Sequence, residues 1–180
     1  MLTITVPEWE DWDPVKQMFV SGKATVLTME HSLLSLSKWE SVFHKSFLNN
    51  KNITAEEMLA YIRFMTLTKD VDPAVYLHLT SENMKTIDDY INDPMTATTF
   101  SGKNNKKPSK KIITNELIYW WMVSLGIPFE CQKWHLNRLM TLIRVANIKS
   151  QPSKKMNKKE QGAQARSLNA MRRARSGSKG

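Results

Sequence analysis

Cys131 and His135 are the two residues whose types and spacing most readily suggest chemistry. Residues i and i+4 share a face of a helix, so the pair could present two metal ligands or a thiol beside a base. A structural zinc site normally needs four ligands, and His31, His44 and His78 form no partner motif. A thiol nucleophile needs an orienting third group and an oxyanion site, which no motif marks. We expect core packing here, with no metal and no cofactor.

Two pairs of carboxylates, Glu56 with Glu57 and Asp88 with Asp89, are the next candidates for acid–base chemistry. Sequence neighbours on a helix point about 100° apart, so neither pair converges on one substrate. The chain also has no Walker loop, no G-x-G-x-x-G and no H-E-x-x-H motif. We therefore expect solvated helix faces, no catalytic residues, and a protein that is not an enzyme.

The element that must position the Cys–His pair is residues 112–149, the densest apolar stretch of the chain. Its pattern predicts a helical hairpin. Thr114 or Asn115 can cap the first helix, because either side chain can accept a bond from an orphan backbone N–H. Gly126 can end that helix, and a second helix is expected over residues 129–148.

The first 50 residues predict a small sheet followed by a helix. Residues 2–6 alternate apolar and polar, which predicts a strand. Residues 16–20 and 24–29 flank Ser21-Gly22-Lys23, where glycine permits a tight hairpin turn. Residues 30–47 then carry an apolar stripe at helical spacing.

Two more helices are expected before residue 93. Thr54 and Glu57 have the spacing of a capping box, which predicts a helix that ends before Asp70. Pro73 suits a helical first turn. Thr80 or Ser81 can then cap a helix that runs through Ile91.

Charge divides the chain more sharply than hydrophobicity does. Residues 149–180 hold ten Lys or Arg and one acid, so the tail carries the whole net charge of +9. Residues 1–100 hold eight basic and fourteen acidic side chains, a net of −6, and residues 101–111 add five lysines. The acidic front, the lysine loop and the basic tail could attract one another or other copies of the protein. Beyond about 8 Å, physiological salt screens such attraction.

Two tryptophans in an acidic segment, Trp9 and Trp12, either contact a partner or cover the sheet. Trp120 lies in the run Tyr119–Trp120–Trp121, and one helix face cannot bury all three. One of those side chains must face another layer or a partner.

The basic tail either contacts phosphates or docks on an acidic protein. Residues 149–180 contain no aromatic residue, which disfavours a stacking platform for single-stranded nucleic acid.

The other candidate partner-binding residues share positive charge or lie on a narrow apolar stripe of the tail. They are Lys103, Lys106, Lys107, Lys110, Lys111, Lys154, Lys155, Lys158, Lys159, Arg166, Leu168, Met171, Arg172, Arg173 and Arg175.

Cysteine usage and hydropathy predict a soluble intracellular protein with no membrane partner. A single cysteine excludes an internal disulfide and fits a reducing compartment. The longest apolar run, residues 117–123, is far shorter than the roughly 20 residues of a membrane span. Acidic residues follow the first strand at once, unlike in a signal peptide.

Five segments resemble a family of small proteins of tailed bacteriophages, and the likeness covers most of the chain. They are EHSLLSLSKWES (30–41), YIRFMTLTKDVDP (61–73), DPMTATTF (93–100), IYWWMVSLGIPFECQKWHLNRLMTLIRVANIK (118–149) and SLNAMRRAR (167–175). Family members are encoded among virion morphogenesis genes and are often described as tail assembly chaperones, which keep the long tape measure protein soluble while the tail tube polymerises. The family supplies no catalytic residues.

The resemblance implies a tail assembly chaperone that binds phage tail proteins in the host cytoplasm. The first alternative is a structural virion component at the head–tail junction or in the tail. An alternative of another class is an accessory protein that binds nucleic acid nonspecifically through its basic tail.

The sequence as a whole predicts a mainly helical α+β fold, in which a small antiparallel sheet packs on about five helices. The globular domain is expected over residues 1–148, and the basic tail, 149–180, is expected to stay disordered unless bound. Within the domain we expect a β-hairpin region (1–29), helices (30–92), a connector with the lysine loop (93–111) and the helical hairpin (112–148).

Overall fold

A computed structural model of the chain describes residues 1–100, 112–150 and 158–176, in which the fold is α+β and mainly helical, as predicted. The chain divides into two compact units, Met1–Asn147 and Ile148–Gly180. The strands are β1 (Leu2–Val6), β2 (Trp9–Asp13), β3 (Met18–Gly22) and β4 (Thr25–Met29). The helices are α1 (Leu33–Phe43), α2 (Ala55–Met65), α3 (Ser81–Asn92), α4 (Asn115–Ser124), α5 (Leu136–Ser150) and α6 (Lys158–Ser176), with 3₁₀ helices η1 (Pro73–His78) and η2 (Phe129–Lys133).

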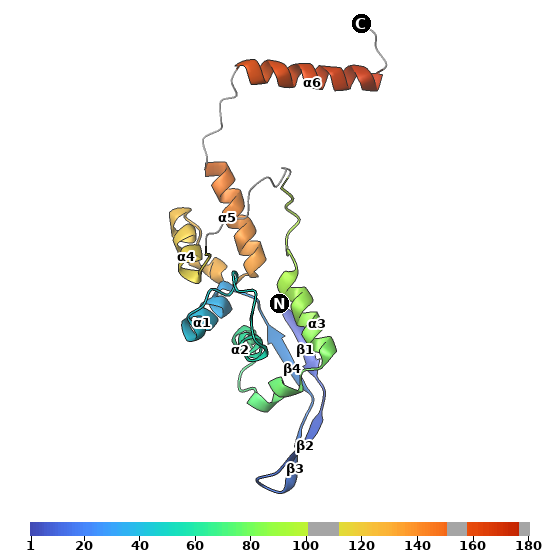
Figure 1. Cartoon of the computed structure of the whole chain (residues 1–180), viewed down its shortest axis with the longest axis vertical. Coiled ribbons are helices and arrows are strands. Elements are labelled where there is room, and N and C mark those ends of the chain that lie inside the picture. Colours follow the sequence, from blue (N-terminus) through green and yellow to red (C-terminus); the bar gives the residue numbers. More distant parts are fainter. Residues whose placement is uncertain (101–111, 151–157, 177–180) are drawn as a thin grey trace. The chain divides into compact units, whose positions relative to one another are not determined.

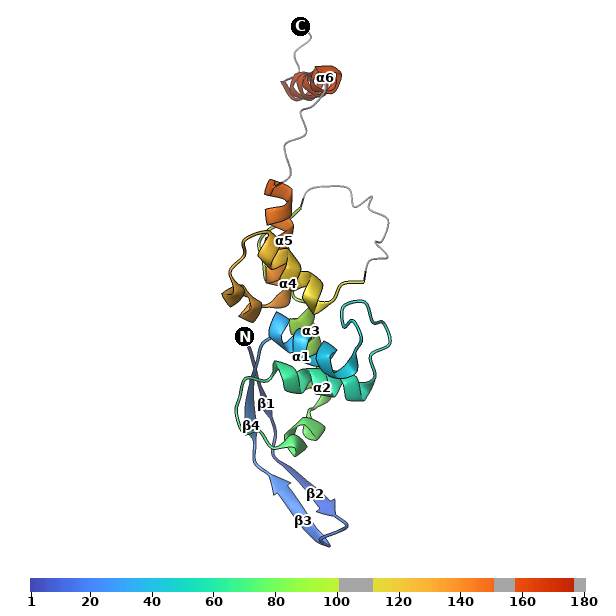
Figure 2. The same cartoon turned by 90° about the vertical axis from the view of Figure 1, so that its left-hand side faces the viewer.

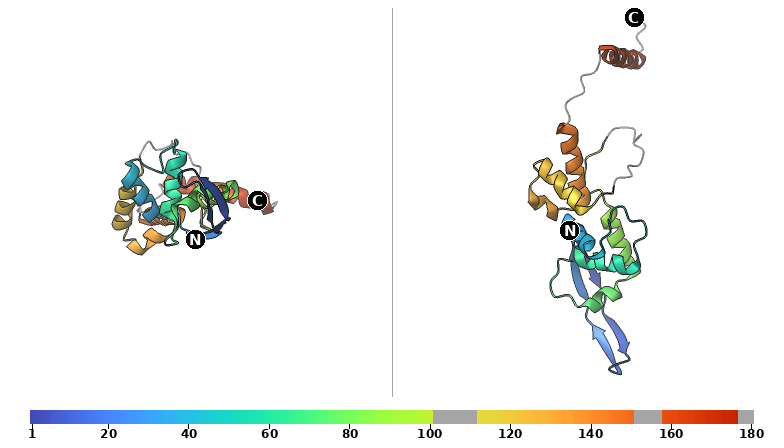
Figure 3. Two further views of the ribbon diagram at one scale, coloured as in Figure 1. Left: turned by 90° about the horizontal axis from the view of Figure 1, so that it is seen from below. Right: turned by 60° about the vertical axis from the view of Figure 1, so that its left-hand side comes forward.

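The four strands form one long antiparallel ribbon in two parts. β1 pairs with β4, and β2 pairs with β3 further along (Figures 1 and 2). In the first part, Ile4, Val6, Leu27 and Met29 are buried beneath the helices, as the alternation in β1 predicts. The second part extends beyond the helices of its unit (Figure 3).

The predicted hairpin turn at residues 21–23 is wrong. β3 continues to Gly22, and the turn lies between β2 and β3 instead. There the Asp13 carboxylate accepts hydrogen bonds from the backbone N–H groups of Val15 and Lys16, at 2.9 and 3.1 Å. Asp-Pro is a turn former of this kind, since an Asp side chain can bond the backbone two residues on.

The capping signals of α2 and α3 are confirmed, but the first predicted helix is too long. Thr54 and Thr80 accept from the N–H groups three residues later, and each helix begins at the next residue. The helix predicted over residues 30–47 spans only α1, because Glu30 bonds Met65 in an extended conformation and Ser32 caps the helix. His44, at φ 53°, ends it.

The first helix of the predicted helical hairpin is capped by a residue from another helix. Neither Thr114 nor Asn115 makes the expected side-chain cap. Instead the buried carboxylate of Glu40, on α1, accepts from the backbone N–H of Asn115 at 2.7 Å and from its side-chain amide at 2.9 Å. Its other oxygen accepts from the N–H of Phe47 at 2.9 Å. One side chain thus joins α1, the loop after it and the start of α4.

The second helix, predicted over residues 129–148, is also wrong in its first third. The chain forms η2, and α5 begins only at Leu136. The break arises because the Leu136 N–H donates to the carbonyl of His31 at 2.7 Å, and His135 forms an isolated bridge with Ser32. Both α4 and η2 pack against α1.

The basic tail, expected to be disordered unless bound, contains the helix α6. Its apolar positions Leu168 and Met171 are exposed, at 49% and 68%. The helix forms from residues of high helix propensity, chiefly Ala, Arg, Gln and Lys. None of the helices in the described parts of the chain is long and apolar enough to cross a bilayer.

Replacing Glu40 by Ala should lower the free energy of unfolding by about 2–5 kcal/mol, because three buried N–H donors lose their acceptor. Urea denaturation monitored by circular dichroism measures the change. The matched control is Glu56→Ala, at an exposed position in the first turn of α2, where the loss should stay below about 1 kcal/mol. Equal losses in the two variants would contradict the bridging role of Glu40.

Candidate protein-binding site

The β2–β3 hairpin has two different faces, which its register defines. Trp12 lies opposite Phe19 on one face, and Trp9 lies opposite Gly22 on the other. Side chains alternate along a strand, so Glu10 shares the face of Trp12, whereas Asp11 and Asp13 share the face of Trp9.

Trp9 attaches the hairpin to the rest of its unit. Its indole stacks on the ring of His78 in η1, with centroids 4.0 Å apart, and the His78 ring nitrogen lies 3.2 Å from the Asp11 carboxylate. The indole also lies directly over Gly22, where an added Cβ would come within 2.2 Å of it. Gly22 is therefore needed for close packing. Trp9 thus packs between the neighbouring strand and η1.

The Trp12 side chain, in contrast, is 52% exposed, and most of the residues around it at the hairpin end are also exposed. It meets Phe19, itself 62% exposed, edge to face at 5.1 Å. Met18 and Val15 are also exposed. Aromatic side chains displayed together in this way are typical of protein–protein contacts, where they supply large area at low entropic cost.

The hairpin is also acidic. Residues 8–22 carry four carboxylates and one lysine, a net of −3. Lys16 pairs with Asp13 at 3.6 Å, and hydrogen bonds from the Lys16 and Val15 N–H groups lower the pKa of that carboxyl group. Glu8 and Glu10 form no ion pair with any residue that the structure describes.

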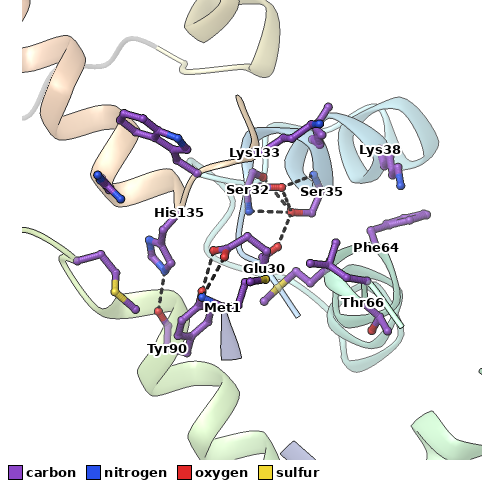
Figure 4. Close-up of a pocket in the computed structure, with 16 residues that line it drawn as sticks. Met1, Glu30, Ser32, Ser35, Lys38, Phe64, Thr66, Tyr90, Lys133 and His135 are labelled. Carbon is purple, nitrogen blue, oxygen red and sulfur yellow. Dashed lines mark hydrogen bonds and ion pairs between the residues drawn. The ribbon is translucent and has the colours of Figure 1, made fainter. Parts of the chain in front are cut away.

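A second feature of the first unit is a cleft of about 700 Å³ between α1, α2 and the start of α5 (Figure 4). Its apolar lining comes from Leu34, Phe64, Met65, Leu67, Met95 and Trp134. Three exposed cations, Lys38, Lys133 and Arg138, also line it. The Arg138 guanidinium lies 4.3 Å from the Trp134 ring centroid, and neither lysine pairs with an acid in the described residues.

The polar groups at the bottom of the cleft satisfy one another. The Glu30 carboxylate accepts from the Tyr90 hydroxyl at 2.7 Å and lies 3.1 Å from the Met1 amine (Figure 4). Burial, together with the bond to Glu30, raises the pKa of Tyr90, so the phenol remains a donor. His135 donates from Nε2 to the Tyr90 carbonyl at 3.0 Å.

Beneath this layer lies a buried histidine. The Nδ1 atom of His31 hydrogen-bonds the Tyr61 hydroxyl at 2.6 Å, and its ring meets that of His135 at 5.0 Å. Burial, with a smaller contribution from His135, lowers the pKa of His31 from 6.5 to about 3. His31 is therefore held neutral beneath the cleft, bonded to Tyr61 and packed on His135.

Cys131 and His135, which the i, i+4 spacing placed on one helix, do not lie on the same helix. Cys131 is buried in η2, and His135 comes just before α5. Within the described ranges, no group of three or more His, Cys, Asp or Glu could hold a metal ion.

The predicted basic sites are only partly described. The loop lysines (Lys103, Lys106, Lys107, Lys110, Lys111) and Lys154 and Lys155 lie outside the described residues. α6 holds the others: Lys158, Lys159, Arg166, Leu168, Met171, Arg172, Arg173 and Arg175. Of these, the residues from Arg166 onward are exposed.

Two surfaces were not predicted from the sequence. Trp120 is the exposed member of its aromatic run, at 61%, and it lies on α4 near the exposed Val123. The cleft is the second surface, and its lining residues lie up to 137 positions apart in the sequence, from Met1 to Arg138. The only local signal for it is the i, i+4 spacing of Trp134 and Arg138, which favours a cation–π contact.

Comparisons of the chain with protein-family models, with curated proteins and with solved structures found no match. The class of site is therefore defined by its geometry. The hairpin and the cleft have the exposed aromatic groups, apolar hollow and polar rim of protein-binding surfaces.

The low pKa of His31 predicts a pH dependence of stability. Below pH 6.5 the unfolded chain binds a proton at this residue, and the folded chain does not until about pH 3. The free energy of unfolding is therefore unaffected by this group above pH 6.5, and it falls as the pH decreases from 6.5 towards 3. The slope should approach about 1.4 kcal/mol per pH unit.

His31→Gln, which can still hydrogen-bond Tyr61, should remove that part of the slope. Urea denaturation of both proteins from about pH 7 to pH 5 measures the difference. Parallel curves would show that His31 is not held neutral by the fold.

Replacing Gly22 by Ala should displace the Trp9 indole from His78, because the new Cβ would occupy the space of the ring. The His78 ring protons should then lose the upfield NMR shift that a stacked indole produces. Ser21→Ala, at the exposed neighbouring position, should leave those resonances unchanged. Retention of the shift in Gly22→Ala would contradict the close packing.

Proposed function

We propose that the protein is a non-enzymatic bacteriophage tail assembly protein that acts through protein–protein contacts. The observation that supports contact as its mode of action is the hairpin, which carries Trp12 and Phe19 beyond the helices of its unit and leaves both more than half exposed. The likeness of five segments to a phage morphogenesis family supports the setting in tail assembly.

A role as chaperone of the tape measure protein agrees with these surfaces. A long helical protein has apolar stripes flanked by charged side chains. A surface that binds such a stripe needs exposed aromatic side chains surrounded by charged residues. The hairpin supplies that combination, and Trp120 with Val123 supplies a second exposed apolar area. A permanent subunit of the virion would use the same surfaces, and it is the alternative within this proposal.

The double variant Trp12→Ala, Phe19→Ala should reduce the yield of infectious virions at least about tenfold, since the two rings are the centre of the contact surface. Plaque assays on cells that supply the variant to a phage lacking the gene measure the yield. Leu77→Ala, which removes a 69% exposed apolar side chain of η1, is the matched control and should complement fully. Full complementation by the double variant would contradict the proposal.

The same lysates separate the two roles. For a chaperone, quantitative mass spectrometry should detect the protein in the lysate and not in virions purified on a density gradient. A fixed number of copies per virion would instead establish the structural role.

A further inference from the structure

The two protein-binding surfaces of the first unit have opposite charge. Residues 8–22 carry a net charge of −3, or −2 when Lys23, which lines a hollow with Glu8 and Glu10, is included. Glu8 and Glu10 form no ion pair among the described residues. The cleft is surrounded by Lys38, Lys133 and Arg138. Its one acid, Glu30, is already bound by Tyr90 and the Met1 amine. The potential at the mouth of the cleft is therefore positive, and an acidic partner is favoured there.

The apolar parts of the two surfaces also match. One face of the hairpin end offers the two aromatic rings of Trp12 and Phe19, both more than half exposed. The cleft offers apolar walls that include Phe64 and Trp134. Its volume of about 700 Å³ lies in the range of roughly 300–1,000 Å³ that suits a group the size of two aromatic side chains.

A molecule cannot place its own hairpin in its own cleft. Met1 and Glu30, at the start of β1 and the end of β4, lie at the cleft, whereas the turn after Asp13 is at the other end of the ribbon (Figures 1 and 4). Twelve residues of extended chain separate Met1 from Asp13, a span of up to about 40 Å at 3.3 Å per residue. The pairing of β1 with β4 keeps the base of the ribbon straight and prevents the hairpin from folding back.

We propose that the cleft is the binding site for the β2–β3 hairpin of a second copy of this chain. The inference rests on the proposed function in one respect, since it names the partner of the same hairpin. Trp12 and Phe19 enter the cleft between Phe64 and Trp134. Glu8 and Glu10 of the inserted hairpin then lie near the cations Lys38, Lys133 and Arg138 of the cleft, where each carboxylate can form an ion pair.

This contact joins different surfaces of the two molecules, so it is heterologous. Each copy that inserts its hairpin still has a vacant cleft, and the next copy can add there. Repetition gives a closed ring or an open filament, according to the rotation between neighbours. Such a contact does not involve Trp120, which is exposed on α4.

The first test is the mass of the full-length protein as a function of concentration, measured by analytical ultracentrifugation. We expect growth beyond a dimer. Two double variants should each be monomeric: Trp12→Ala, Phe19→Ala has no functional hairpin, and Lys133→Glu, Arg138→Glu has no functional cleft. Trp120→Ala and Lys85→Glu, which change an exposed aromatic and an exposed lysine elsewhere, should assemble like the wild type.

The decisive experiment mixes the two double variants in equal amounts. One still has its cleft and the other still has its hairpin, so the mixture should form a 1:1 dimer that does not grow. A symmetric hairpin-to-hairpin contact cannot give this result, because one partner lacks the rings. Circular dichroism and thermal melting verify that both variants are folded, which makes a monomeric mixture a valid refutation.

Other outcomes identify other occupants. If Leu168→Asp in α6 abolishes assembly and the cleft variant does not, the hairpin binds the basic helix of another copy and the cleft proposal is wrong. If the wild type stays monomeric at all concentrations, self-assembly is excluded. The virion-yield assay is independent of both results, so the proposed function can stand or fall separately.

Discussion

The arrangement of the helices depends on one buried carboxylate, that of Glu40. Burying an ion costs several kcal/mol unless its oxygens are bonded, and here three N–H donors satisfy them. Two of those donors belong to Asn115, which is 75 residues away in sequence, at the positive N-terminal end of α4. The bond therefore holds α4 against α1. Since α1 also supplies Leu34 and Lys38 to the cleft, the same interaction stabilises one wall of that surface.

A second constraint keeps the ribbon in a fixed direction. β4 is bonded on one edge by β1, and on its other edge Thr28 and Glu30 bond the chain at Leu67 and Met65. This closes both edges of β4 at the base of the ribbon. The hairpin has less support, from the Trp9–His78 stack and the contact of His78 with Asp11. An isolated two-stranded hairpin is only marginally stable, so a contact on its outer part would add to its order.

Local signals predicted the elements that local interactions form. The Thr54–Glu57 and Thr80 caps and the strand β1 could be found in the sequence, because each depends on neighbours within four residues. The aromatic run indicated only that one of its three side chains could not be buried with the others, not which one. The helix break before Leu136 could not, since it arises from a bond to His31 on a distant segment. The hairpin turn was misplaced because Gly22 suggests a turn, whereas its real role is to make room for an indole on the opposite strand.

The cleft could not be predicted from the sequence either, because its residues are distant in the chain and only the fold brings them together. Its cations come from α1, η2 and α5. Apart from the i, i+4 spacing of Trp134 and Arg138, their local sequence does not distinguish them from ordinary solvated lysines and arginines. They become a site only when the Glu40 bond and the break before α5 bring those elements together. The hairpin, in contrast, presents its rings and carboxylates within one short segment. A contact between the two surfaces would therefore require a folded acceptor but only a short donor, and ordering that donor would cost part of the binding energy. Such contacts form reversibly, because the cost of ordering the donor lowers the net affinity.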